Sequence, residues 1–135
     1  MGCIEIALLD DNPLYAMAFA TVIDAYGECR VVSRSQSLPE LMEALAEYPP
    51  DLIVADADLL DRSLHEGVGG LFDRYGQIPV LLMGFEPPLH LEAMRAAHPN
   101  LRFLSKDRTL DVILNTLVYH SSTSNARNRG AGPTD

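Results

Sequence analysis

The sequence has few cysteines, few positive charges and no long apolar run, and each absence narrows what the chain can be. Its two cysteines, Cys3 and Cys29, lack the spacing of a metal site and are too few for a disulfide framework. We expect both to be buried thiols of a reducing cytoplasm. No apolar run approaches the roughly 18 residues that span a membrane, and the first residues lack the basic region of a signal peptide. These features predict a soluble cytoplasmic domain without a membrane partner.

Positive charge is scarce relative to negative charge. Lysine and arginine number 10 against 19 aspartates and glutamates, a net charge of −9. Direct binding of nucleic acid needs clustered cations on phosphates, so the composition argues against it. A divalent cation or a basic protein fits this negative charge better than nucleic acid as a binding partner. At 135 residues the chain is long enough for one domain with a substantial core.

One stretch, residues 49–58, organises the interpretation of the rest. Pro49 and Pro50 end the preceding element, and residues 51–56 form a short apolar run typical of a fully buried strand. The run leads into Asp56 and Asp58. A buried parallel strand that ends in Asp places the carboxylate where open α/β sheets keep their sites. The alternative is that Asp56 only caps the following helix.

Further apolar runs alternate with helical patterns along the chain. The expected strands are 3–9, 30–33, 51–56, 78–84 and 101–105, and the expected helices are 14–26, 37–48, 70–75, 87–97 and 109–120. This alternation predicts an α/β fold of the flavodoxin-like (βα)5 type, a doubly wound sandwich. Its parallel five-stranded sheet would have the order 2-1-3-4-5. We expect the domain to cover residues 1–120 and residues 121–135 to form a disordered tail.

The predicted strand order brings acids together. The first strand ends at Asp10 and Asp11 and the third at Asp56, and the crevice of such a sheet opens above these two strands. Clustered carboxylates repel one another, and Mg²⁺ relieves that repulsion. With the metal present, one carboxylate can act as a nucleophile towards a phosphoryl group. Lys106, after the fifth strand, can pair with the resulting charge.

Three segments resemble the receiver domains of two-component response regulators. Residues 9–14 are similar to the acidic start of receivers that precede helix-turn-helix domains. Residues 50–56 resemble the phosphoacceptor strand, and residues 103–107 resemble the lysine strand. The resemblance covers about residues 3–120.

The resemblance implies a signalling module rather than an enzyme, with Asp56 as phosphoacceptor and Lys106 in contact with the phosphoryl group. It implies Mg²⁺ held by Asp10, Asp11, Asp56 and the main-chain carbonyl of Asp58. Phe103 falls at the position of the family's switching aromatic residue. The implied partners are a histidine kinase or phosphotransfer protein and a downstream protein target.

The sequence departs from the family pattern at the end of the fourth strand. The family has Ser or Thr there, and this chain has Met83 followed by Gly84. A thioether cannot donate the hydrogen bond that the hydroxyl gives to the phosphoryl group. The loop expected at 57–62 also lacks the Met-Pro and Asp-Gly steps that are usual in the family. A receiver-fold interaction module that works without phosphorylation is therefore the main alternative.

Other interpretations of the acids and histidines are weaker. Asp56-Ala57-Asp58 is also similar to the nucleophile motif of haloacid-dehalogenase phosphatases, but that motif belongs on the first strand. A flavin site would need amides and hydroxyls where this chain has Asp10 and Asp11. The histidines are expected on loops or helix surfaces without a metal role; they are His65, His90, His98 and His120.

The first and fifth predicted helices carry an excess of apolar residues. Residues 14–23 contain no charge, and a helix that is apolar all round must be buried on a second side. In the order 2-1-3-4-5 these two helices share one face of the sheet. We expect a homodimer through them. The predicted outward residues are Tyr15, Phe19, Val112 and Tyr119.

Overall fold

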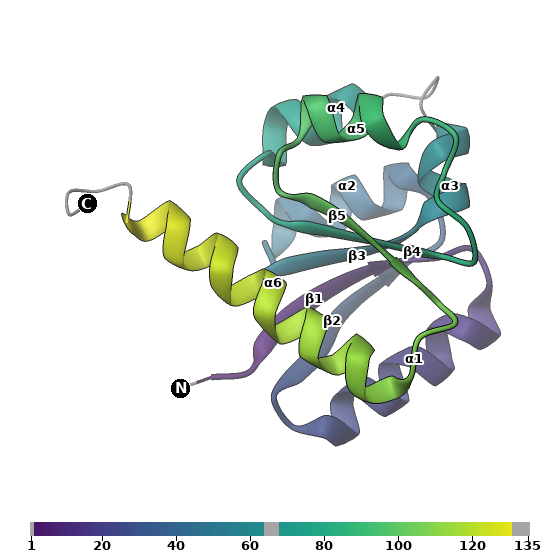
Figure 1. The fold of residues 1–135 in the computed structure, drawn as a ribbon, viewed down its shortest axis with the longest axis vertical. Helices are drawn as coiled ribbons and strands as arrows, with labels where there is room; N and C mark the ends of the chain where they lie inside the picture. Colours follow the sequence, from purple (N-terminus) through teal and green to yellow (C-terminus); the bar gives the residue numbers. More distant parts are fainter. Residues whose placement is uncertain (1, 64–67, 131–135) are drawn as a thin grey trace.

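A five-stranded parallel sheet forms the centre of the molecule (Figure 1). The computed structural model describes residues 2–63 and 68–130. The strand order is β2-β1-β3-β4-β5, and every neighbouring pair is parallel. The predicted α/β class and the order 2-1-3-4-5 are confirmed. Within the described residues, no helix combines the length and apolar character that crossing a bilayer requires.

The elements follow the expected alternation. The strands are β1 (Ile4–Leu9), β2 (Cys29–Ser35), β3 (Leu52–Asp56), β4 (Val80–Gly84) and β5 (Leu101–Ser105). The helices are α1 (Pro13–Tyr26), α2 (Leu38–Glu47), α3 (Ala57–Arg62), α4 (Val68–Tyr75), α5 (Leu91–Ala97) and α6 (Leu110–Gly130). Asn12 begins α1, because its side chain accepts hydrogen bonds from the Leu14 and Tyr15 amides. Gly27 ends α1 with a φ of 93°, a left-handed conformation that glycine adopts readily.

Helices cover both faces of the sheet, and each face has its own core. Helices α1 and α6 cover one face, which we call the α1/α6 face (Figure 1). Helices α2, α3, α4 and α5 cover the opposite one, the α2–α5 face. Strand side chains alternate between them: Ile6 and Leu8 belong to the α1/α6 core, and Ala7 and Leu9 to the other. This alternation decides which face each site residue joins.

Three expectations about element boundaries are wrong. The helix expected from residue 87 begins only at Leu91, after a turn at residues 89–90. Residues 57–62, expected as a loop, form α3, because the Asp56 side chain accepts a hydrogen bond from the Leu59 amide and begins a helix. Helix α6 was expected to end near 120 but continues to Gly130, because no glycine or proline interrupts the chain before that residue. The expected tail is thus helical over 121–130, and residues 131–135 lie outside the described part.

Three side chains differ in burial from the expectations. Cys3 is exposed, whereas Cys29 is buried as predicted. His98 and His120 are buried, not on helix surfaces. His98 Nε2 lies 3.0 Å from the Ile78 carbonyl, and His120 Nε2 lies 2.8 Å from that of Asn100 and 3.2 Å from that of Val80. Carbonyls only accept, so both Nε2 atoms donate. His65 lies outside the described residues.

Burial lowers the pKa of both His98 and His120. The unfolded chain then binds protons more readily than the folded one below about pH 6.5, so stability present above that pH is lost as the pH falls. We expect urea denaturation to give a smaller free energy of unfolding at pH 5.5 than at pH 7.5. His120→Phe should cost about 1–3 kcal/mol at pH 7.5 by leaving two carbonyls without their donor, and should weaken the pH dependence. His90→Gln, at an exposed position, is the control. Equal wild-type stability at both pH values would contradict the prediction.

Candidate functional site

The carboxyl edge of the sheet brings two acids and a lysine together on the α1/α6 face. Core residues of that face near the strand ends are Leu8, Val54 and Leu104. The residues two positions further along, and therefore directed to the same face, are Asp10, Asp56 and Lys106. The Lys106 amide also donates to the Gly84 carbonyl at 2.8 Å, which ties this residue to the end of β4.

The Lys106 ammonium bridges the two carboxylates. Its Nζ lies 2.8 Å from Asp56 Oδ1 and 3.5 Å from Asp10 Oδ2. The side chains are only 11% (Lys106), 14% (Asp56) and 3% (Asp10) exposed, so water screens the charges weakly. Burial alone would lower the pKa of Lys106, but the hydrogen bond to Asp56 and the two negative charges outweigh burial and raise it. The lysine is therefore a permanent cation at neutral pH.

Both oxygens of Asp56 are engaged. Oδ1 accepts from Lys106, and Oδ2 accepts from the Leu59 amide at 2.9 Å in the first turn of α3. The helix-cap alternative for Asp56 therefore describes one of its oxygens correctly, while the other joins the charged site. A chemical change at the Asp56 carboxylate therefore alters its hydrogen bond to Lys106, its hydrogen bond to the first turn of α3, or both.

The third expected carboxylate does not converge on this site. Asp11 is exposed and forms an ion pair with Arg62 of α3 at 3.0 Å. Asp10 accepts the Asn12 amide on its other oxygen, a local turn that leaves Asp11 outside the buried edge. Asp58 lies in the first turn of α3, so its carbonyl belongs to a helix and not to the loop expected from the sequence.

The fit of Mg²⁺ to these residues is therefore partial. The described residues contain no cluster of three or more His, Cys, Asp or Glu side chains that could hold a metal. Mg²⁺ nevertheless needs only one or two carboxylates together with waters. Asp10 and Asp56 already share one cation, the Lys106 ammonium, and so provide that smaller donor set. The arrangement fits a two-carboxylate site and does not fit the four-ligand set expected from the sequence.

Met83 lies beside Asp56 on the neighbouring strand. The two residues are partners in the β3–β4 register, and Met83 is buried in the α1/α6 core. No hydroxyl is thus available at this position. The next residue, Gly84, has little room for a side chain, since a Cβ there would lie 3.1 Å from the Ala57 Cβ. Phe103 packs against the core of the α2–α5 face, opposite to Met83.

Two aromatic residues that sequence reasoning did not assign to the site also contact Lys106. Its Nζ lies 4.1 Å from the centre of the Tyr15 ring and 5.9 Å from that of Phe85. Tyr15, expected to face outward, is half-buried: its ring packs over the lysine, and the residue also lines the surface between α1 and α6. The cap Asn12 and Pro13 indicate where α1 begins, but no local pattern shows what the ring covers.

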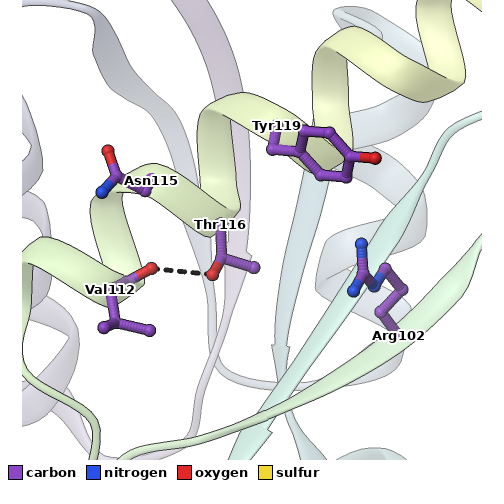
Figure 2. Close-up of a pocket in the computed structure, with 5 residues that line it drawn as sticks. All are labelled: Arg102, Val112, Asn115, Thr116 and Tyr119. Carbon is purple, nitrogen blue, oxygen red and sulfur yellow. Dashed lines mark hydrogen bonds between the residues drawn. The ribbon is translucent and has the colours of Figure 1, made fainter.

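A separate hollow lies between β5 and α6 and shares no residue with the acidic edge (Figure 2). Its volume is about 280 Å³, and it is lined by Arg102, Val112, Asn115, Thr116 and Tyr119. The Arg102 guanidinium lies 5.9 Å from the centre of the exposed Tyr119 ring. The one hydrogen bond drawn there, Thr116 Oγ1 to the Val112 carbonyl, is internal to α6. Nothing in this hollow repeats the buried charges of the acidic edge.

A five-stranded parallel sheet in this order, covered by helices on both faces, is the fold of response-regulator receiver domains. Solved structures with the same fold include the signal receiver domain of NarL from Mycobacterium tuberculosis, with a TM-score of 0.70 and 18% identity over 90% of this chain and 98% of that one. The receiver domain of an HD domain-containing protein from Pseudomonas fluorescens Pf-5 gives a TM-score of 0.73 and 17% identity, over 96% of this chain and 94% of that one.

A third structure, the anti-anti-sigma factor PhyR from Bartonella quintana, gives a TM-score of 0.72 and 20% identity over 98% of this chain and 53% of that one. No protein-family model matches the sequence, and no curated protein matches it. At these identities the likeness establishes the fold: the chain has the receiver-domain fold.

Burial raises the pKa of Asp10, against the opposing effects of the Asn12 amide and Lys106. An acid whose pKa is raised on folding contributes stability at low pH that is lost as the pH rises from about 3.9 through the folded value. Asp10→Asn should therefore increase the free energy of unfolding at pH 7, as measured by urea denaturation. Asp11→Asn, at the exposed ion pair, should change it by less than about 1 kcal/mol. A loss of stability in Asp10→Asn would contradict this account.

Proposed function

We propose that this domain is a signalling receiver that accepts a phosphoryl group on Asp56. The observation that carries the proposal is the contact of Lys106 Nζ with Asp56 Oδ1 at 2.8 Å, made between residues 50 positions apart. A buried cation fixed beside a carboxylate suits a step in which negative charge is added to that carboxylate. The receiver fold of the chain supports the same function.

The proposed reaction transfers a phosphoryl group to the Asp56 carboxylate. An Asp56 oxygen attacks the phosphorus of a phosphohistidine or a small acyl phosphate, and the bond from phosphorus to the donor's nitrogen or oxygen breaks. The electron pair leaves with the donor, and Asp56 becomes an acyl phosphate. Lys106 offsets the added charge. Mg²⁺, bound by Asp10 and Asp56, would neutralise the phosphoryl oxygens. The donor partner would be a histidine kinase or a phosphotransfer protein.

A second candidate function is a receiver-fold interaction module that needs no phosphorylation. Two observations favour it: Asp56 Oδ2 is already used to begin α3, and Met83 presents no hydroxyl opposite Asp56. Either function would act through protein contacts of the domain. One structural neighbour, PhyR, is itself described as an anti-anti-sigma factor. We place the chain in the cytoplasm, where its two free thiols, Cys3 and Cys29, would remain reduced.

Incubation with a small acyl phosphate and Mg²⁺ separates the two functions. We expect intact mass spectrometry to show one added phosphoryl group on the wild type and none on Asp56→Asn. Lys106→Gln should slow the labelling by about 100-fold, because the cation that offsets the added charge is gone. An unlabelled wild type that still binds protein partners would support the second candidate.

Met83→Thr tests the missing hydroxyl. It should enlarge the conformational response to phosphorylation, seen as amide NMR shifts, because it adds a donor opposite Asp56. Met83→Val is the matched control, since valine has the shape of threonine without the hydroxyl. Equal responses of the two variants would show that the hydroxyl is irrelevant here.

We also propose that α1 and α6 form a homodimer interface. Their surface carries exposed apolar residues, namely Leu14, Met17, Val22, Leu110 and Val112. A groove of about 190 Å³ lies between the two helices, lined mainly by Tyr15, Phe19, Val22, Ile23, Leu110 and Ile113; we call it the α1/α6 groove. Of the predicted outward residues, Phe19 is buried, whereas Val112 and Tyr119 are exposed.

The proposed dimer can be tested by introducing one charge on α1 and measuring the oligomeric state by sedimentation. Val22 is 40% exposed on α1, and Val22→Glu should shift a dimer towards monomer by placing carboxylates in the apolar contact. Leu89→Glu is the control, because Leu89 is 85% exposed and lies outside both helices. If the wild type remains monomeric at a protein concentration of about 100 μM, a stable interface is excluded.

A further inference from the structure

The Lys106 ammonium has aromatic as well as acidic neighbours. Its distance of 4.1 Å from the centre of the Tyr15 ring falls within the range of a cation–π contact. Phe85, at 5.9 Å, is at the limit of that range, and its side chain is largely exposed. Because Lys106 itself is nearly buried, the Tyr15 contact is of the desolvated kind, which is the stronger one.

The position of Tyr15 follows from the start of α1. Helical side chains lean towards the N-terminus of their helix, and α1 begins beside Asp10 at the carboxyl edge. A large residue in the first turn of α1 is thereby directed over that edge. The amide of Tyr15 is held by the Asn12 side chain at 3.1 Å, which fixes the residue's main chain.

Tyr15 also belongs to the α1/α6 groove. Its ring stacks on Phe19, with centroids 6.0 Å apart and an interplanar angle of 24°, and both residues line the groove. One side chain therefore contacts the cation of the acidic site and forms part of an exposed apolar surface. Phe103, the family's switching aromatic position, packs on the opposite face and has no such connection to this groove.

We propose that Tyr15 is the positioning residue of Lys106, and that it transmits changes of charge at Asp56 to the α1/α6 groove. When Asp56 loses or gains negative charge, Lys106 is drawn less or more strongly towards it. The lysine main chain is anchored to Gly84, so the side chain makes the adjustment. The ring that covers the ammonium, and the Phe19 ring stacked on it, then adjust with it. The role in phosphoryl transfer rests on the function proposed above; the coupling through Tyr15 does not.

The test compares three substitutions on α1. Tyr15→Leu removes the ring, and Tyr15→Phe keeps the ring face and removes only the hydroxyl. Phe19→Leu is the matched control, because it removes the neighbouring ring of the stack without touching Lys106. Circular dichroism and urea denaturation establish that each variant is folded before the other readouts are compared.

The first readout is the proton NMR shift of the Lys106 ε-methylene group. A ring face over this group shifts its signal upfield. We expect the shift in the wild type, Tyr15→Phe and Phe19→Leu, and its loss in Tyr15→Leu. This pattern establishes the contact in solution, and a wild type without the upfield shift would overturn the proposal; the next two readouts test the positioning role itself.

The second readout uses Asp56→Asn, which removes the charge without any phosphorylation. We expect this substitution to shift the methyl signals of Val22 and Ile113 in the wild type and in Tyr15→Phe, and to leave them nearly unchanged in Tyr15→Leu. Equal shifts in all three backgrounds would overturn the coupling, whether or not the protein is ever phosphorylated.

The third readout is the rate of Asp56 labelling by a small acyl phosphate. Tyr15→Leu should slow labelling about tenfold, and Tyr15→Phe should restore it, because the ring face that orients Lys106 returns. If the wild type is not labelled at all, the phosphoacceptor function fails and the two NMR readouts still decide the role of Tyr15. If the wild type is labelled and Tyr15→Leu reacts equally fast, the positioning role fails and the phosphoacceptor function stands.

Discussion

The contact of one ammonium with two nearly buried carboxylates is the interaction on which this domain's carboxyl edge depends. Asp10 and Asp56 come from neighbouring strands and would repel each other without Lys106. Burial makes the arrangement costly, as the raised pKa of Asp10 indicates. A buried ion pair contributes little net stability compared with apolar residues, so the stability of the fold does not account for this cluster.

Asp56 connects the two faces of the sheet through its two oxygens. Oδ1 contacts Lys106, whose side chain is covered by Tyr15 of α1, and Oδ2 begins α3 on the opposite face. A group attached to either oxygen must weaken one of these bonds. The replacement of an expected loop by α3 therefore places the first turn of a helix directly after the acid. It also places Arg62 where it engages Asp11, which separates that acid from the other two.

The amino ends of β4 and β5 are held by a different kind of polar contact. His98 and His120 are buried and donate to carbonyls at or near these strand ends. Their lowered pKa values keep them neutral at pH 7, so they act as hydrogen-bond donors without a charge. The carboxyl edge of the sheet thus combines full charges in a nearly buried cluster, whereas the amino edge uses neutral donors that stabilise the fold.

Local sequence was sufficient for the fold, because strand burial, helix starts and turn residues are short-range patterns. The alternation of apolar runs with helical patterns predicted the sheet and its order, and the acids and the lysine that follow three of these runs indicated the edge where the candidate site lies. Tertiary structure alone decided the directions of side chains at that edge. It turned Asp11 outward to Arg62, placed Tyr15 over Lys106 and buried two histidines. Each of these depends on atoms brought together from distant parts of the chain, and neither the spacing nor the hydrophobic period of a sequence encodes such contacts.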